Sequence, residues 1–364
     1  MKKILKNSAV QSLLTSLICI VLGMFVGYVV LLLIEPSGAW DAISAVGKNF
    51  LSYSREATRL KHMGTTLVKT APLIMCSLSV LFSYKVGLFN IGAAGQYVIG
   101  ACAGLYAALI LGWSWLPCTI ISAVAAAVWG AITGVLKAYF NVNEVISGIM
   151  LNWIGLYLTN MVLNGVKDPA SPYTYSLQAK GRAAIIPSLG LEAFFSNNKY
   201  VTIAIPLAVI FAILVWVVME KTKFGYELKA TGYNKNAAKY CGMAEKRNII
   251  VSLAISGALA GLSAAFYFLT DIEQWEVTLS SVPGMGFNGI AAAFLGGLSP
   301  IGTIFSSFLI QHIKDGGAYV DLSIYCSQIS DLIASFIIYL CGFVGFLKIA
   351  MNTVLDKTKE GGKK

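Results

Sequence analysis

The stretch VGLFNIGAAGQYVIGACAGLYAALILGWSWLPCTIISAVAAAVWGAITGVL, residues 86–136, contains 51 residues and no charged side chain. A transmembrane helix needs about 20 apolar residues, so this run suffices for two spans. Asn90 and Gln96 stand among three glycines near its start, and neither side chain can face lipid without a large cost. The stretch therefore predicts a membrane protein with close helix contact or a broken helix around 87–96.

The composition of the 364-residue chain extends this pattern. It is 57% hydrophobic and 12% charged, whereas soluble domains carry about 25% charged residues. We expect an all-α fold, a polytopic membrane helix bundle that forms a single integral membrane domain over 1–364. The net charge of +10 would suggest nucleic acid in a soluble protein, but the positive-inside rule explains it here, so no nucleic-acid partner is predicted.

Hydropathy predicts about ten spans. The uncharged stretch 277–313 holds Pro283, Pro300 and six glycines, which favours two short or discontinuous helices there. Four GxxxG patterns, at Gly23/Gly27, Gly100/Gly104, Gly130/Gly134 and Gly257/Gly261, permit close helix approach. The predicted spans are 10–34, 65–84, two within 86–136, 145–164, 200–219, 249–270, two within 277–313, and 327–347.

Charge predicts the orientation of these spans. An even number of spans places both termini on one side of the membrane. The basic segments 1–9, 220–248 and 350–364 are expected in the cytoplasm, and the acidic loop 271–276 is expected outside. The 165–199 segment then also lies outside, and the protein is expected in the cell membrane.

Several kinds of site are excluded or disfavoured. The chain has no GxxxxGK[ST] motif, so it is not by itself a P-loop ATPase. Its two histidines, His62 and His312, are far apart in the sequence, which argues against a zinc protease site. The GxGxxG pattern at 284–289 follows no βα unit, which argues against a dinucleotide site. The seven cysteines form no CxxC pair and suit small core positions. We expect no cofactor, no metal site and no enzymatic activity.

Two similar segments occur in the two halves of the chain, FNIGAA at 89–94 and FNGIAA at 287–292. Paired interrupted helices in two halves of a transporter mark a central substrate site, although chance similarity in an Ala/Gly-rich chain is the alternative. The candidate substrate-pathway residues are Asn90, Gln96, Asn152, Phe287 and Asn288. Asn152, within the fifth span, suits an interhelical hydrogen bond and a pathway position equally well.

The loop FGYELKATGYNKNAAKYCGM, residues 224–243, predicts a short helix on a basic inner loop. Asn234 or Asn236 can cap a helix that runs to about Tyr240, and Gly242 can end it. Such a helix suits the docking of a cytoplasmic partner, and a solvated positive-inside loop remains the alternative.

Four segments in this order carry a family resemblance: GLFNIGAAGQ at 87–96, NEVISGIMLNW at 143–153, the 224–243 loop, and GFNGIAAAFLGGLSPIG at 286–302. Together they resemble the permease subunits of bacterial ABC importers of the branched-chain amino acid and simple sugar class. The nucleoside permeases look most similar, and the resemblance covers roughly 65–350.

The resemblance implies a type II importer permease that translocates nucleosides. Its partners would be cytoplasmic ABC ATPase subunits, a second permease subunit and an extracytoplasmic substrate-binding lipoprotein. Asn90, Gln96 and Asn288 match polar positions around the family's translocation path, whereas Ala94 stands where nucleoside permeases often have an acid. The 224–243 loop matches the family's ATPase coupling region, within which we select Gly232, Asn236, Ala237, Ala238 and Gly242.

Three alternatives to a nucleoside permease remain, and the last two belong to other classes. The first is an ABC permease for ribose or another simple sugar. The second, an ion-coupled secondary transporter, would need buried ionisable groups, but Lys69, Glu144 and Asp331 all lie near span ends, where snorkelling accounts for them. A purely structural membrane subunit would leave the paired Gly/Asn segments unexplained.

Overall fold

A computed structural model describes residues 8–321, 323–326, 328–341, 343, 346 and 349. The described part is helical and contains no extended strand, only two isolated β-bridges near the 165–199 segment. The predicted all-α class is therefore confirmed. Residues 1–7 of the predicted cytoplasmic N-terminus and the predicted basic tail at 350–364 lie outside the described residues.

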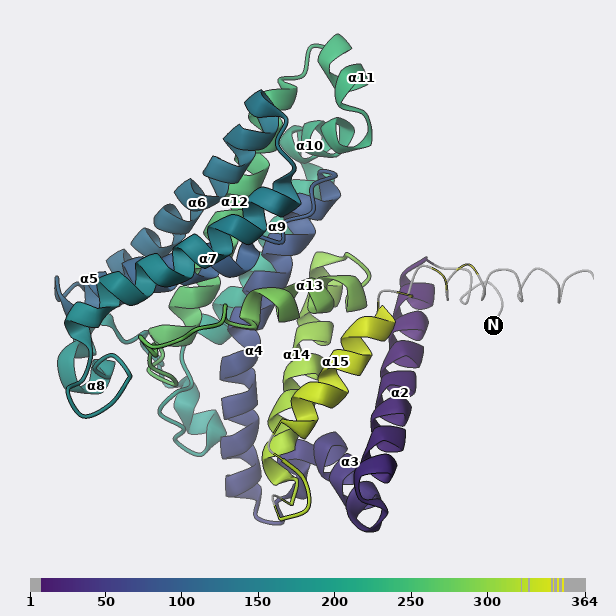
Figure 1. Cartoon of the computed structure of the whole chain (residues 1–364), viewed down its shortest axis with the longest axis vertical. Helices are drawn as coiled ribbons and strands as arrows, with labels where there is room; N and C mark the ends of the chain where they lie inside the picture. Colours follow the sequence, from purple (N-terminus) through teal and green to yellow (C-terminus); the bar gives the residue numbers. More distant parts are fainter. Residues whose placement is uncertain are drawn as a thin grey trace, which may run out of the picture. The chain divides into compact units, whose positions relative to one another are not determined.

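The chain forms two compact units, which are described separately. The first unit combines the residues up to Ser54 with those from Ala291 onward. In this unit α2 packs along α15 and α3 packs on α14 (Figure 1). Its helices are α2 (Ser8–Ile34), α3 (Ala39–Lys48), α14 (Pro300–Gly316) and α15 (Ile329–Cys341).

The second unit, Arg55–Ile290, holds most of the helices and the candidate functional residues. Helices α4 and α12 lie at its centre. In their most apolar stretches of 18 residues, 83% and 67% of the residues are buried, against 33% for α6 and 28% for α9. Its helices are α4 (Glu56–Lys85), α5 (Ala93–Leu109), α6 (Trp115–Phe140), α7 (Glu144–Leu163), α8 (Leu177–Lys180), α9 (Ala204–Lys221), α10 (Lys223–Tyr233), α11 (Lys235–Tyr240), α12 (Glu245–Phe268) and the start of α13 (Met285–Leu295).

The glycine pairs lie at helix contacts, as the GxxxG patterns predict. Gly100 of α5 faces Gly261 of α12 so closely that a Cβ atom on Gly100 would lie 2.6 Å from the Gly261 Cα. Gly257 of α12 lies against the carbonyl of Ala126 in α6, and Gly27 of α2 lies against Ile333 of α15. Close packing of this kind drives helix association in a membrane, where burial of apolar surface contributes little.

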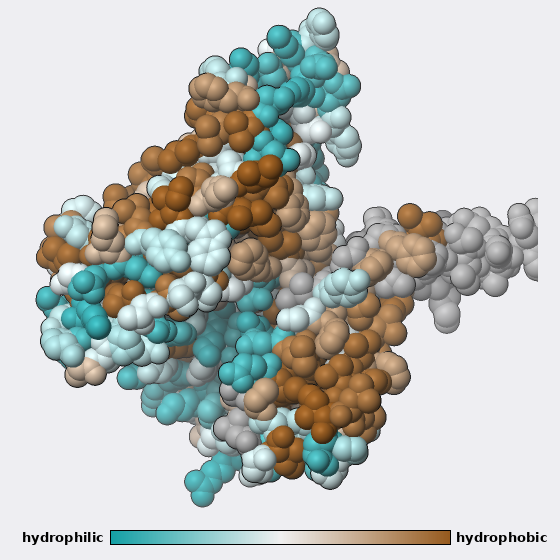
Figure 2. Space-filling view, in the orientation of Figure 1, coloured by the Kyte–Doolittle hydropathy of each residue, from teal (hydrophilic) through white to brown (hydrophobic). Residues whose placement is uncertain are grey.

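Among the described residues, six helices are long and apolar enough to cross a membrane: α2, α4, α6, α7, α9 and α12. The outward face of α6 is apolar, as contact with lipid requires (Figure 2); it exposes Ile120, Val124, Val128, Ile132 and Val135. Each of the ten expected spans contains a helix, but α5, α13, α14 and α15 have 17, 11, 17 and 13 residues. The number of complete crossings therefore stays a prediction, and part of the expected 327–347 span lies outside the described residues.

The residues between the first two expected spans, 35–64, are also largely helical. Helix α4 begins at Glu56, earlier than the expected 65. Its first turns carry charged side chains, so they are helical but do not belong to the apolar run from which the span was predicted. The amphipathic segment after α2 folds into α3, which buries Ile43 and Val46 and leaves Trp40 70% exposed.

The segment between α7 and α9 is tied to the loop after α12. Asp271 accepts hydrogen bonds from the backbone N–H groups of Leu177 (2.8 Å) and Gln178 (3.3 Å) at the start of α8. The Trp275 indole is buried and donates to Asn160 Oδ1 at 3.0 Å. These contacts join two segments that are far apart in the sequence into one cap on this end of the second unit.

Candidate functional site

The helical run breaks at residues 86–92, within the region where the sequence predicts an interruption. Helix α4 ends at Lys85 and α5 begins at Ala93. Gly87 has a φ of 76°, a left-handed conformation that favours glycine. Asn90 and Gly92 lie in the irregular segment, and Gln96 lies in the first turn of α5.

Asn152 of α7 holds both sides of this break together. Its Oδ1 accepts the backbone N–H of Gly95 at 2.7 Å, and its Nδ2 donates to the carbonyl of Ile91 at 3.1 Å. The first N–H groups of a helix have no partner within it. Because the residue preceding α5 is Gly92, which has no side chain, Asn152 supplies the cap from another helix. Of the two roles that the sequence leaves open, the interhelical hydrogen bond is present, and the pathway position stays a prediction.

Asn90 and Gln96 form a buried polar cluster with two serines. Asn90 Nδ2 donates to Gln96 Oε1 (2.9 Å) and Ser256 Oγ (2.7 Å), and Gln96 Nε2 donates back to Asn90 Oδ1 (3.3 Å). Ser256 Oγ in turn donates to the carbonyl of Ser79 at 2.6 Å. Asn90 is 2% exposed and Gln96 is 1% exposed, so their amides join α4, α5 and α12 in this conformation.

The start of α13 lies against the start of α5. A Cβ atom on Gly286 would lie 2.5 Å from the Ala94 Cα, and one on Gly289 would lie 2.8 Å from the Cys76 Cβ. The expected pair of short helices within 277–313 is present as α13 and α14, separated by a turn in which Gly297 and Leu298 have φ of 64° and 54°. The two FN segments thus lie near each other, but their backbones differ: Asn90 precedes its helix, whereas Asn288 lies within the first turn of α13.

Phe287 and Asn288 differ from the other candidate pathway residues in their exposure. Phe287 is 41% exposed, and Asn288 is half-buried. Within the described part of the chain, the Asn288 side chain makes no hydrogen bond, whereas the amides of Asn90 and Gln96 bond to each other and Asn90 also bonds to Ser256. A partly exposed aromatic ring and an amide with unused donors and acceptors are groups that can bind a planar polar molecule.

The 224–243 loop forms two helices, α10 and α11. Asn234 caps α11, since its Oδ1 accepts the N–H of Ala237 at 3.0 Å, and Asn236 lies within the helix. Gly242 follows with a φ of 79°, which ends the helix as expected. Ala238 is buried, whereas Asn236 and Ala237 are exposed, together with Lys235, Lys239 and Tyr240. The α10–α11 end of the second unit is largely hydrophilic (Figure 2).

Helix α10 contacts the break directly. A Cβ atom on Gly87 would lie 2.8 Å from the carbonyl oxygen of Gly232, so only glycine backbones fit at this contact. Beside it, Asn248 of α12 donates to Thr231 Oγ1 at 2.9 Å. The end of α10 therefore touches the chain three residues before Asn90.

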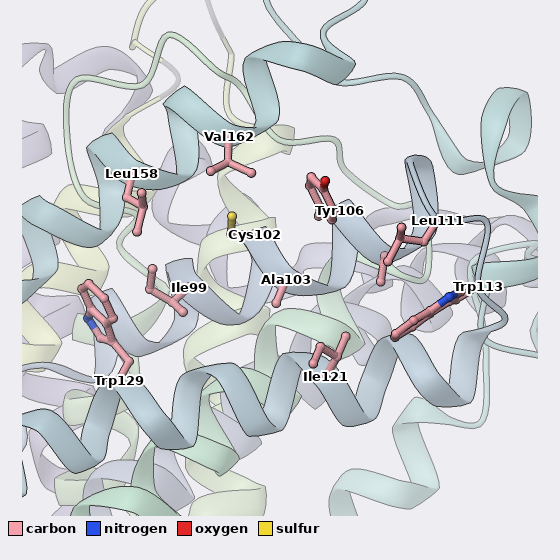
Figure 3. Close-up of a pocket in the computed structure, with 11 residues that line it drawn as sticks. Ile99, Cys102, Ala103, Tyr106, Leu111, Trp113, Ile121, Trp129, Leu158 and Val162 are labelled. Carbon is pink, nitrogen blue, oxygen red and sulfur yellow. The ribbon is translucent and has the colours of Figure 1, made fainter.

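A pocket of about 580 Å³ lies between α5, α6 and α7 (Figure 3). Its walls are apolar and aromatic and include Ile99, Tyr106, Trp113, Trp129 and Leu158. The candidate polar residues Asn90, Gln96 and Asn152 are not among the residues that line it. Its chemistry differs from that of a polar substrate path.

Sequence reasoning missed several residues of this site. Ser79 and Ser256 complete the Asn90 cluster, and Gly286 allows α13 to reach Ala94. One signal was available, because Asn248, Ser252 and Ser256 recur every four residues in α12 and so share one helix face.

Comparison with known proteins identifies the family. Residues 62–342 match the model of the branched-chain amino acid transport system permease component. The chain belongs to this permease family. It is 33% identical to the guanosine ABC transporter permease protein NupP of Bacillus subtilis, over 96% of this chain and 97% of that protein. It is 31% identical to the nucleoside ABC transporter permease protein NupB of Lactococcus lactis, over 97% and 96%.

A third relative is named for a different solute. The chain is 29% identical to the glucose ABC transporter permease protein TsgB13 of Haloferax volcanii, over 78% of this chain and 75% of that protein. No solved structure matches the chain. Family membership makes this permease a multi-pass membrane protein and a transport subunit rather than an enzyme, in agreement with its apolar helices.

Proposed function

We propose that this permease is the membrane subunit of an ATP-driven importer that carries nucleosides across the cell membrane. The observation that carries the proposal is its similarity to NupP and NupB along nearly the whole of all three chains. Because the similarity spans the break at 86–92, α10–α11 and α13, it includes each structural part that transport would use.

The start of α13 suits a nucleoside in its chemistry. A nucleobase has an aromatic face and a polar edge; Phe287 offers a partly exposed ring, and Asn288, which follows it in the sequence, offers a half-buried amide. The ring would stack on the base, and the amide would both donate to and accept from its edge. Asn90, Gln96 and Asn152 line the same path in this proposal, and in this conformation they hold the break in place through their mutual and backbone hydrogen bonds.

The α10–α11 segment would couple transport to ATP hydrolysis in a cytoplasmic ATPase subunit. Helix α11 exposes Asn236 and Ala237 to solvent, whereas Ala238 is buried against the protein. A partner can therefore bind the exposed side of the helix while the Ala238 side stays packed. Gly232 then carries displacement of this segment to Gly87 and the break, since the two backbones touch. Gly242 sets the direction in which the chain leaves α11 toward α12.

The remaining partners follow from this arrangement. A second permease subunit, identical or different, would complete the path, and an extracytoplasmic substrate-binding lipoprotein would deliver the nucleoside. The termini and the 220–248 segment would face the cytoplasm, with the segment capped by Asp271 on the opposite side. The single integral membrane domain over 1–364 would act as one transport subunit.

An uptake measurement with purified components tests this function. The permease is co-expressed with its ATPase, second permease and lipoprotein, reconstituted in vesicles, and supplied with radiolabelled guanosine. The proposal expects uptake that requires ATP and is lost in Phe287→Ala and Asn288→Ala, while Phe287→Tyr, which keeps an aromatic ring, retains it. Unchanged uptake in both alanine variants would remove these two residues from the path.

A sugar permease is the second candidate, because TsgB13 is named for glucose. Competition distinguishes the two. Excess unlabelled ribose or glucose should leave guanosine uptake unchanged if the substrate is a nucleoside, and should abolish it if the path recognises the sugar alone.

A further inference from the structure

Helix α12 carries a buried polar face that the proposed function does not explain. Asn248, Ser252 and Ser256 recur every four residues, and each is 0% exposed. Residues at this spacing lie on the same face of a helix. Polar side chains buried in a membrane helix are costly unless they form hydrogen bonds.

Both ends of this face are anchored. Asn248 Nδ2 donates to Thr231 Oγ1 of α10 at 2.9 Å. Ser256 Oγ donates to the carbonyl of Ser79 at 2.6 Å and accepts from Asn90 Nδ2 at 2.7 Å. One continuous helix thus joins the proposed coupling segment to the polar cluster at the break.

Two polar atoms of this face are nevertheless unpaired. Within the described residues, neither Asn248 Oδ1 nor Ser252 Oγ has a hydrogen-bond partner, and neither atom reaches solvent. The same helix face also places Ser263 against α4, where its hydroxyl donates to the carbonyl of Pro72 at 2.6 Å. The fully used hydroxyls of Ser256 and Ser263 show that α12 can satisfy buried serines against α4.

The register between α4 and α12 locates the gap. The two helices run antiparallel, with Pro72 opposite Ser263 and Ser79 opposite Ser256. The same register places Ser83 opposite Ser252. Ser83 Oγ donates within its own helix, to the carbonyl of Val80 at 2.9 Å, so its proton is already used.

An unpaired buried donor and acceptor raise the free energy of this conformation relative to one that pairs them. We propose that Asn248 and Ser252 are positioning residues that bias α12 toward a second conformation, through which movement of the α10–α11 segment reaches the Asn90 cluster. The inference rests on the proposed function. The glycine-lined contact of α12 with α6, including Gly257 against Ala126 and Gly130 against Leu253, suits a small shift of α12.

Two matched serine variants test the proposal in the reconstituted complex. Ser252→Ala removes a hydroxyl without a partner, so the midpoint of thermal unfolding should stay the same or rise. Because the unpaired hydroxyl no longer raises the free energy of the resting conformation, the shift to the second conformation becomes less favourable. The maximal rate of nucleoside uptake should therefore fall about fivefold, with KM unchanged, as expected for removal of one unpaired buried group. Ser263→Ala removes a bonded hydroxyl from the same helix, so it should lower the midpoint and leave the ratio of uptake to ATP hydrolysis unchanged.

The outcomes separate this inference from the proposed function. If the unaltered complex takes up no nucleoside, the proposed function fails, and the unfolding midpoints still decide the pairing of Ser252. A midpoint lowered as much by Ser252→Ala as by Ser263→Ala would overturn the inference, because the Ser252 hydroxyl would then be bonded at rest. Uptake by Ser252→Ala equal to that of the unaltered complex would also overturn it.

Discussion

The amide of Asn152 in α7 caps the first turn of α5, where its Oδ1 accepts the backbone N–H of Gly95 at 2.7 Å. The Gly95 position admits no larger residue, since a Cβ atom there would lie 2.7 Å from the Asn152 Cα. A helix that begins inside the bundle thus obtains from a neighbouring helix the cap that its own Gly92 cannot provide.

Replacing Asn152 tests this cap. Asn152→Leu leaves the Gly95 N–H and the Ile91 carbonyl unpaired, and interhelical hydrogen bonds in membranes contribute about 0.6–2 kcal/mol. We expect a lower midpoint of thermal unfolding for the purified permease. Asn152→Asp keeps an acceptor for Gly95 and, once its carboxyl is protonated, a donor for Ile91, so it should regain stability relative to Asn152→Leu as the pH is lowered. The same loss in both variants at every pH would contradict the capping role.

Gly286 should tolerate no side chain. Gly286→Ala places a methyl group against the Ala94 backbone, which cannot move without displacing α5, so nucleoside uptake should be severely reduced. The matched control is Gly284→Ala two residues earlier, where the nearest atom to the added Cβ is Asn288 Nδ2 at 3.8 Å. That variant should transport normally. Equal activity of the two variants would show that α13 does not depend on this contact.

The same contact limits the size of the residue that can stand at position 94. Ala94 is fully buried, and its backbone packs directly against Gly286. An acid at this position would meet the α13 backbone. We therefore expect Ala94→Glu to reduce the amount of folded permease recovered in detergent, whereas Ala94→Ser, which adds one small atom, should be recovered in nearly normal amounts.

The α11 cap should control coupling without affecting the rest of the fold. Asn234→Ala loses the hydrogen bond to the Ala237 N–H, and such a loss costs a helix about 0.5–2 kcal/mol. Because α11 has only six residues, we expect this change to weaken nucleoside-stimulated ATP hydrolysis by the complex.

Asn234→Ser is the control for this variant, since serine is an equally good cap. It should restore ATP hydrolysis to near the unaltered rate. A rate of ATP hydrolysis in Asn234→Ala equal to that of the unaltered complex would mean that α11 is not the segment to which the ATPase binds.

Two exposed cysteines report the orientation of the chain. Cys241 follows α11, and Cys326 lies in the segment between α14 and α15. Ten spans with a cytoplasmic N-terminus place Cys241 inside and Cys326 outside. In intact cells, a membrane-impermeant maleimide should label a variant that keeps only Cys326, and should label one that keeps only Cys241 after permeabilisation. The reverse pattern would contradict the predicted orientation.

Much of the architecture could be predicted because it depends on local composition. Long uncharged runs bounded by charges gave the helices, and the glycines near Gly87 and Gly297 marked both interruptions. The choice between Asn234 and Asn236 as the cap could not be made, because both are good caps and only the backbone geometry distinguishes them. Asn234 has an extended backbone, with φ of −157°, whereas Asn236 is already helical.

The partners of the polar residues could not be predicted, since they depend on how helices pack in three dimensions. Asn90 was a candidate from its glycine-rich surroundings, but its bond to Ser256 joins residues 166 positions apart. Asn152 likewise reaches Gly95 across 57 positions. A single sequence does not show which residues of α5, α7 and α12 lie opposite one another. It therefore indicates which polar residues need partners, but not which partners they have.

Guanosine uptake by vesicles that contain the permease with its ATPase, second permease and lipoprotein shows whether this chain is part of an ATP-driven importer. We expect uptake against a concentration gradient when ATP is supplied on the side of the membrane that carries the ATPase subunits, and no uptake when ATP is replaced by a non-hydrolysable analogue. Uptake that persists without ATP and follows an imposed proton or sodium gradient would contradict it and would favour a secondary transporter.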